Sequence, residues 1–318
     1  MIQIAIVGIG AGAAAALLFA SVTSGSWLSI PLFYLAPLPI MIAGLGWSHW
    51  AAMTAALAGA LGLGAVFGAV FLLAFAAGAG FPAWWLSYLA MLARPVAVTN
   101  GSGQGAESFE WYPPGRLVVW AAVLGVLVVI IAIPNFGVDA DSFRAGLRDA
   151  LNAIMRVNNG TPARAGSNTE RLLEILVNAI PPAAAVLATI TNLLNLWLAA
   201  RVVKFSGRLA RPWPQLSSMS FPPLMTPALA VAIVLSFLDG MLGIVAASLL
   251  LAYGVLGFAV LHAITQGMSA RPFLLSITYA GVILLGWPIL ALCLLGLVEM
   301  AIGLRGRVST KRGPPTRS

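Results

Sequence analysis

The stretch AAMTAALAGALGLGAVFGAVFLLAFAAGAGFPAWWLSYLAML, residues 51–92, contains no charged side chain. At about 1.5 Å per residue, one helix of this length would be about twice as long as the ~30 Å hydrocarbon core of a bilayer, so we expect two crossings. The first Asp, Glu, Lys or Arg of the chain is Arg94. Only 8% of the 318 residues are charged, against about a quarter in soluble domains. The sequence therefore predicts an all-α fold, a polytopic transmembrane helical bundle.

The net charge of +8 comes from two short basic segments, at 201–211 and in the tail at 305–318. Short segments rich in Lys and Arg beside apolar spans mark the cytoplasmic side of a membrane protein, so we expect both to face the cytoplasm. A lipid-headgroup or nucleic-acid patch is the competing interpretation, and we predict no nucleic-acid partner. The cations are Arg201, Lys204, Arg208, Arg211, Arg305, Arg307, Lys311, Arg312 and Arg317.

Further apolar segments at 2–21, 28–45 and 117–134 are expected to be spans. The first contains GIGAGA at 8–13, which is similar to the glycine loop of a dinucleotide-binding unit. That loop requires an acid about 20 residues later, but the next acid is Glu107, so we interpret the glycines as small residues that allow close helix packing. The segment lacks the basic start of a signal peptide and is expected to be the first helix.

The only substantial segment outside the membrane is expected at 137–172. Within it, DADSFRAGLRDALNAIMR (139–156) places its apolar residues on one stripe, which is typical of an amphipathic helix. This helix either lies on the membrane surface or serves as a lid or a docking surface. After a turn-rich break, another helix is expected to continue through Pro181 and Pro182 to about residue 198.

Asp239 lies between two apolar runs, in SFLDGMLG (236–243). A single helix over 221–262 would be too long for one crossing, and Asp239 with Gly240 is the strongest turn signal within it. A turn there makes Asp239 an interfacial acid and avoids a cost of at least about 2.5 kcal/mol for an aspartate inside the bilayer. The alternative is a functional acid at the mouth of a cavity.

The basic tail returns to the cytoplasm only after an even number of crossings. The run 272–304 has GWP in its middle, so we expect two short, tilted half-spans that meet near 286–288. The predicted count is eight to ten spans with both termini cytoplasmic. We expect a single membrane domain at 1–304 and then the tail; the domain consists of N-terminal spans (1–136), the extramembrane segment (137–172) and C-terminal spans (173–304).

Motifs for catalysis are not found. The chain has two histidines and one cysteine, Cys293, and it has no P-loop, H-E-x-x-H or G-x-S-x-G pattern. We therefore predict no enzyme activity, no metal and no cofactor. Polar residues on apolar helices remain as speculative ligand-binding candidates: Asn192, Asn195, Tyr253 and Glu299.

Asn195 lies six residues before Arg201, and Glu299 lies six residues before Arg305. This spacing predicts equal depth in the membrane, about 9 Å inside the two basic anchors. We therefore predict a ligand pocket where the helix at 173–198 faces the last apolar segment. The alternatives are that these side chains hydrogen-bond between helices and that Glu299 pairs with Arg305.

Three stretches carry a family resemblance: PLPIMIAGLGWSHWAAMTAALAGALGLG (37–64), AYGVLGFAVLHAI (252–264) and LLGLVEMAIGLRGR (294–307). With them the chain resembles the uncharacterised DUF2232, or YybS-like, bacterial membrane proteins, which are grouped with the substrate-binding S components of energy-coupling-factor transporters. The resemblance implies a small-molecule-binding role.

S components dock their membrane partner through A-x-x-x-A in the first helix. Here Ala11 with Ala15, and Ala16 with Ala20, have that spacing. The chain departs from the family pattern before its terminal basic cluster: Glu299, Met300 and Ala301 stand where family members commonly have an aspartate and aromatic residues.

The leading functional expectation is a transporter-like, small-molecule-binding subunit of the bacterial inner membrane without its own ATPase. The alternative is a structural or assembly protein that docks partners through its amphipathic helix and basic loops. The expected partners are the lipid bilayer, other membrane subunits and a small-molecule ligand.

Overall fold

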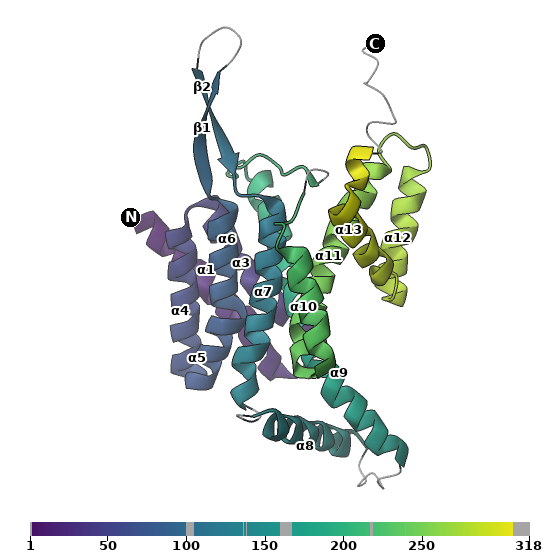
Figure 1. The fold of residues 1–318 in the computed structure, drawn as a ribbon. Helices are drawn as coiled ribbons and strands as arrows, with labels where there is room; N and C mark the ends of the chain where they lie inside the picture. Colours follow the sequence, from purple (N-terminus) through teal and green to yellow (C-terminus); the bar gives the residue numbers. More distant parts are fainter. Residues whose placement is uncertain are drawn as a thin grey trace.

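A computed structural model describes residues 2–99, 105–135, 137, 139–159, 167–216, 219–238 and 240–307. The described chain is a bundle of long helices with one helix lying across its lower end and a β-hairpin at its upper end (Figure 1). The helices are α1 Ile2–Ala20, α2 Ser29–Tyr34, α3 Pro37–Gly46, α4 His49–Phe67, α5 Ala69–Phe75, α6 Phe81–Ala90, α7 Pro114–Ala132, α8 Ala140–Asn159, α9 Ser167–Phe205, α10 Met225–Leu238, α11 Gly243–Ile264, α12 Arg271–Leu285 and α13 Ile289–Ile302.

Seven helical segments of the described chain are long and apolar enough to cross a membrane. Three further apolar helices, α10, α12 and α13, are shorter. The helical membrane bundle is thus confirmed, and the predicted count of eight to ten spans is reached only if some of the shorter helices also cross. The long segments are Ile2–Ser24, Ser29–Gly46, His49–Phe67, Ala69–Ala90, Pro114–Ala132, Glu170–Phe205 and Gly240–Ile264.

The 51–92 stretch falls in two helical segments, each long and apolar enough to cross, as predicted, and the turn between them is at Gly68. This residue ends α4 with a positive φ of 89°, a conformation that glycine adopts at little cost. The return segment is α5, a π-helical turn Ala76–Gly80, and α6. Phe75 packs the return segment closely against α4, since a Cβ placed on Gly59 would be 2.7 Å from the Phe75 ring.

The GIGAGA segment is part of α1 and packs on α4. A Cβ on Gly8 would be 2.9 Å from the carbonyl oxygen of Ala51, and one on Gly12 would be 2.5 Å from that of Ala55. Side chains at these positions would separate the helices. Gly8 and Gly12 therefore serve close helix packing, as predicted, whereas a Cβ on Gly10 would meet no atom within 4 Å.

Side chains from distant parts of the chain meet at one end of the bundle, which we call the basic end. Arg208 lies 4.4 Å from the ring centroid of Trp47, and Arg211 donates to the carbonyl oxygens of Ala90 and Tyr112, each at 2.8 Å. Because the helices alternate in direction, these contacts place the ends of α3, α6 and α9 and the start of α7 together.

The first helix, α1, begins at the basic end, and the last helix, α13, ends there. Gly8 lies against the first turn of α4, so α1 starts there, and Arg305, just after α13, donates to the carbonyl oxygen of Met219 at 2.8 Å. In Figure 1 the basic end is at the top and α8 lies at the bottom. We call the bottom the α8 end.

The polar segment expected as a loop at 94–115 contains a β-hairpin instead. Strands β1 Ala93–Thr99 and β2 Gly105–Trp111 pair antiparallel, from Ala93 opposite Trp111 to Thr99 opposite Gly105. The hairpin projects from the basic end (Figure 1). It adds a small β element to the predicted all-α fold.

The two short helices predicted in 272–304 are present as α12 and α13. They meet at Gly286, whose φ of 73° allows the sharp reversal. Only α13 is tightly packed: a Cβ on Gly257 would collide with the carbonyl oxygen of Leu292, and one on Gly296 with that of Tyr253. These glycines bring α11 and α13 into backbone contact.

The chain reverses between α10 and α11, as predicted. Thr226 hydrogen-bonds Tyr253 at 3.0 Å, and a Cβ on Gly243 would be 3.8 Å from that of Ser236, so the two helices run antiparallel. Asp239 itself lies outside the described residues, and its assignment as an interfacial acid stays a prediction.

Candidate functional site

The four polar candidates at membrane depth are buried. On α9, the Asn195 amide nitrogen donates to the carbonyl oxygens of Tyr34 and Thr191, each at 2.8 Å. The first bond joins α9 to the end of α2. Asn192 lies on the same helix and is 2% exposed. Asn195 thus forms the interhelical hydrogen bond that was the alternative to ligand binding.

Glu299 pairs locally. Gly303 ends α13 in the left-handed conformation, with φ of 62°, and turns the chain back. The Glu299 carboxylate then accepts the backbone N–H of Arg305 at 3.1 Å and its Nε–H at 2.8 Å. Its carboxylate is thus satisfied by its neighbour six residues later, the simpler of the two interpretations.

Tyr253 is fully buried in α11. Its hydroxyl shares the hydrogen bond with Thr226 of α10, and its ring meets the edge of Phe221 with centroids 5.4 Å apart. These contacts hold α10 on α11 and leave the side chain surrounded by protein.

The contacts of Asn195 and Glu299 do not support a pocket shared by the two residues, and that pocket stays a prediction. Helix α11 packs against both α9 and α13. Asn195 donates to the carbonyl oxygen of Tyr34 in α2, whereas Glu299 accepts from Arg305, just after α13.

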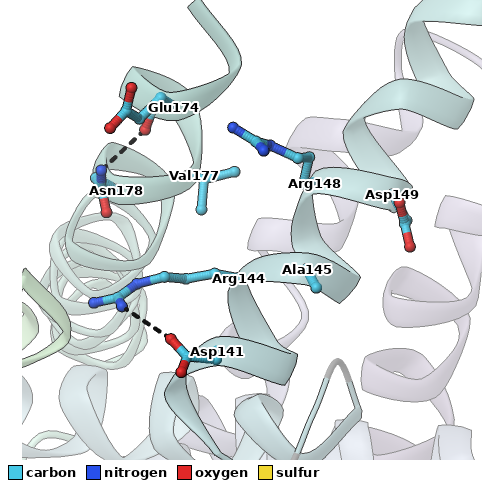
Figure 2. A pocket seen from close by; sticks show the side chains of 8 residues that line it. All are labelled: Asp141, Arg144, Ala145, Arg148, Asp149, Glu174, Val177 and Asn178. Carbon is cyan, nitrogen blue, oxygen red and sulfur yellow. Dashed lines mark hydrogen bonds and ion pairs between the residues drawn. The ribbon is translucent and has the colours of Figure 1, made fainter. Parts of the chain in front are cut away.

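The structure places a polar pocket elsewhere, at the α8 end, between α8 and the first turns of α9. Its cavity volume is about 610 Å³. Figure 2 shows Arg144 and Arg148 extending from α8 toward Glu174 and Asn178 on α9, while Asp149 points away. The lining residues are Asp141, Arg144, Ala145, Arg148, Asp149, Glu174, Val177 and Asn178.

An apolar cluster beneath the pocket fixes the distance between its two walls. Phe143 and Leu147 of α8 pack with Val177 of α9, and all three are buried. Part of the apolar stripe predicted for this helix is therefore buried against α9. The arginines sit on the polar face of α8 directly above it.

The start of α8 is fixed by Asp139. Its side chain accepts the backbone N–H groups of Asp141 at 3.1 Å and Ser142 at 2.9 Å. These are typical N-cap bonds. The bond from Ser142 holds the pKa of Asp139 below its ordinary value.

The charges in the pocket are only partly paired with one another. Arg144 lies 3.6 Å from Asp141 across one helical turn. Among the described carboxylates, none forms an ion pair with Arg148. The Asn178 amide donates to the backbone carbonyl oxygen of Glu174 at 3.0 Å (Figure 2).

The sequence reasoning missed this site, although part of its signal was present. Arg144 and Arg148 are spaced by four residues on the polar face of α8, and Glu174 and Asn178 are spaced by four on α9. Each pair is therefore on one helix face. That the two faces oppose each other is decided by tertiary packing.

No metal centre accompanies the pocket: in the described ranges, no three His, Cys, Asp or Glu residues are grouped so as to hold an ion. Comparison of the chain with protein-family models, curated proteins and solved structures finds no match.

Proposed function

We propose that this multi-pass membrane protein is the solute-binding subunit of a transport system in the bacterial inner membrane, and that the pocket between α8 and α9 receives the solute. The observation that carries the proposal is the pocket itself. It lies outside the apolar bundle, has a volume of about 610 Å³, and is lined by two arginines of α8 and by Glu174 of α9.

The distribution of charge supports a definite orientation. Arg201, Lys204, Arg208 and Arg211 lie at the basic end, and the positive-inside rule assigns this end to the cytoplasm. The α8 end then faces the outside of the cell. A subunit that collects a solute for uptake needs its site on that side.

The residues define the class of solute. Two guanidinium groups on one helix face are suited to a carboxylate or phosphate, which accept paired N–H bonds. Glu174 can accept a hydrogen bond from an amine or a hydroxyl group on the same molecule. The pocket therefore suits a small polar solute that carries an anionic group and a donor group.

The chain has no nucleotide-binding motif, so energy for transport would come from a partner subunit. The resemblance to the DUF2232 family, and through it to transporter S components, supports the same division of labour.

Native mass spectrometry tests the proposal. Protein purified in mild detergent from its own membranes should carry a stoichiometric small molecule. Arg148→Ala should remove this adduct or weaken its binding about tenfold to a hundredfold, since a hydrogen bond to a charged group contributes about 1.5–3 kcal/mol.

Arg171→Ala is the matched control, because Arg171 is exposed on the same end of α9 and does not line the pocket. It should retain the adduct. Wild-type protein without any adduct, or equal loss in both variants, would contradict solute binding at this pocket.

The alternative function is the docking of protein partners, and the hairpin favours it. β1 and β2 form a two-stranded sheet, so both outer edges are free to pair with another strand. A protein that co-purifies in place of a small molecule, and is lost when 95–109 is replaced by a short Gly-Ser linker, would support this function.

A further inference from the structure

Three cations at the basic end lie over aromatic rings: Arg208 over Trp47, as described above, and Arg201 and Lys204. Arg201 is 5.4 Å from the ring centroids of both Trp197 and Trp213. Lys204 is 4.9 Å from the same Trp213 ring. Two positive charges thus converge on one indole.

No acid balances these charges. Among the described residues, no carboxylate forms an ion pair with Arg201, Lys204 or Arg208. The sequence contains no Asp or Glu between Glu174 and Asp239. Like charges held close together without a counter-charge favour an anion from outside the chain.

The surroundings place this cluster at a membrane surface. Phe205, at the last residue of α9, is 84% exposed, and Trp197, two turns earlier, is 48% exposed. Large apolar side chains so exposed on a spanning helix face lipid. Trp at the boundary is typical of the interfacial layer, so the neighbouring cations are at headgroup depth.

From these observations we infer that Arg201 and Lys204, which share the Trp213 ring, form a binding site for the phosphate group of an anionic phospholipid. Arg208, over Trp47, adds positive charge at the same end of the bundle. A guanidinium held over a ring can still donate N–H groups at its edge, and these match phosphate oxygens. The exposed Phe205 and Trp197 would lie beside the acyl chains.

The site is distinct from the solute pocket, because it lies at the opposite end of α9. Its failure would leave the proposed function untouched. It is also more specific than a general positive charge at the cytoplasmic face, since it depends on rings that hold the cations in place.

Delipidated protein in detergent provides the test, with phosphatidylglycerol and phosphatidylcholine of equal chain length as probes. Native mass spectrometry should show that phosphatidylglycerol is retained in preference to phosphatidylcholine. Arg201→Gln/Lys204→Gln should weaken phosphatidylglycerol binding about tenfold or more. Trp213→Leu keeps both charges and should weaken binding about two- to fivefold.

Arg94→Gln/Arg307→Gln removes the same charge from the same end and is the control, which should bind like wild type. Size-exclusion profiles and thermal unfolding midpoints establish that each variant is folded. Equal retention of the two lipids by wild type, or equal loss in both double variants, would overturn the inference.

Two further outcomes separate other ligands. Inorganic phosphate at millimolar concentration should not displace phosphatidylglycerol, because the acyl chains contribute to binding; full displacement would assign the site to a free anion. The second outcome is a protein that co-purifies only when Arg201 and Lys204 are present, while the two lipids are retained equally. That result would overturn the inference and assign the site to a protein partner.

Discussion

The Glu299 carboxylate accepts two hydrogen bonds from one residue, the backbone N–H of Arg305 at 3.1 Å and its side-chain Nε–H at 2.8 Å. The Arg305 guanidinium in turn donates to the carbonyl oxygen of Met219 at 2.8 Å. The pair therefore ties the end of α13 to the segment before α10. An acid expected to bind a ligand holds two parts of the bundle together.

Glu299→Ala should lower the free energy of unfolding by about 2 kcal/mol, because it leaves a largely buried guanidinium without its charged acceptor. The thermal unfolding midpoint in detergent measures the effect. Glu110→Ala breaks the Arg94–Glu110 pair, whose carboxylate side chain is 53% exposed, and should change stability by less than about 0.5 kcal/mol. Similar losses in the two variants would contradict a structural role for the buried pair.

Gly257→Ala should be destabilising by about 1–3 kcal/mol, because the new methyl group collides with the carbonyl oxygen of Leu292 and forces α11 and α13 apart. Gly62→Ala is the matched control: it lies inside α4, and no atom lies within 4 Å of the added Cβ. That change should be neutral or stabilising by up to about 1 kcal/mol. Thermal unfolding of both variants decides the comparison.

The start of α8 should depend on pH through Asp139. Its pKa is held below the ordinary value of 3.8 by the hydrogen bond from Ser142. A pKa lowered on folding stabilises the folded form above the ordinary value, and this contribution is lost as the pH falls through the lower, folded value. Hydrogen exchange of the amides at 140–150, corrected for the intrinsic effect of pH, should show protection decreasing in that range.

Asp139→Asn supplies the control for this pH dependence, because asparagine caps a helix without titrating. The variant should keep the first turn of α8 protected at neutral pH and lose the acid transition. An unchanged transition in Asp139→Asn would assign it to another group.

Cysteine labelling tests the orientation on which the solute pocket depends. Cys293 is buried, so Cys293→Ser supplies a background for single cysteines. A membrane-impermeant maleimide applied to intact spheroplasts should label Arg171→Cys at the α8 end and leave Ser206→Cys at the basic end unlabelled. Inverted vesicles should give the opposite result, and the reverse pattern would place the pocket in the cytoplasm.

Features set by neighbours in sequence were predicted well. The reversal near Gly286 involves a few consecutive residues, so glycine and proline at short spacing were sufficient. The pairing of Glu299 with Arg305 also joins residues at short spacing, but the sequence offered it only as the alternative to ligand binding. The amphipathic helix α8 also follows from local periodicity.

Features that join distant residues were missed. The bond from Asn195 to Tyr34 spans 161 positions. The hairpin was missed for a different reason: its strands are close in the sequence, but their composition is that of a polar loop. The pocket depends on the packing of α8 against α9, and the sequence of neither helix predicts that contact. Non-local partners are not encoded in the periodicity of either segment.

The sequence by itself determined that the chain is a helical membrane protein, where most spans begin and end, and that the cations gather at one end. It did so because the cost of placing charge in hydrocarbon acts on each residue separately. Tertiary structure alone decided which polar groups meet. Hydrophobicity selects the depth of a residue but not its neighbour, and the neighbour is chosen by glycine contacts such as that of Gly257 with α13.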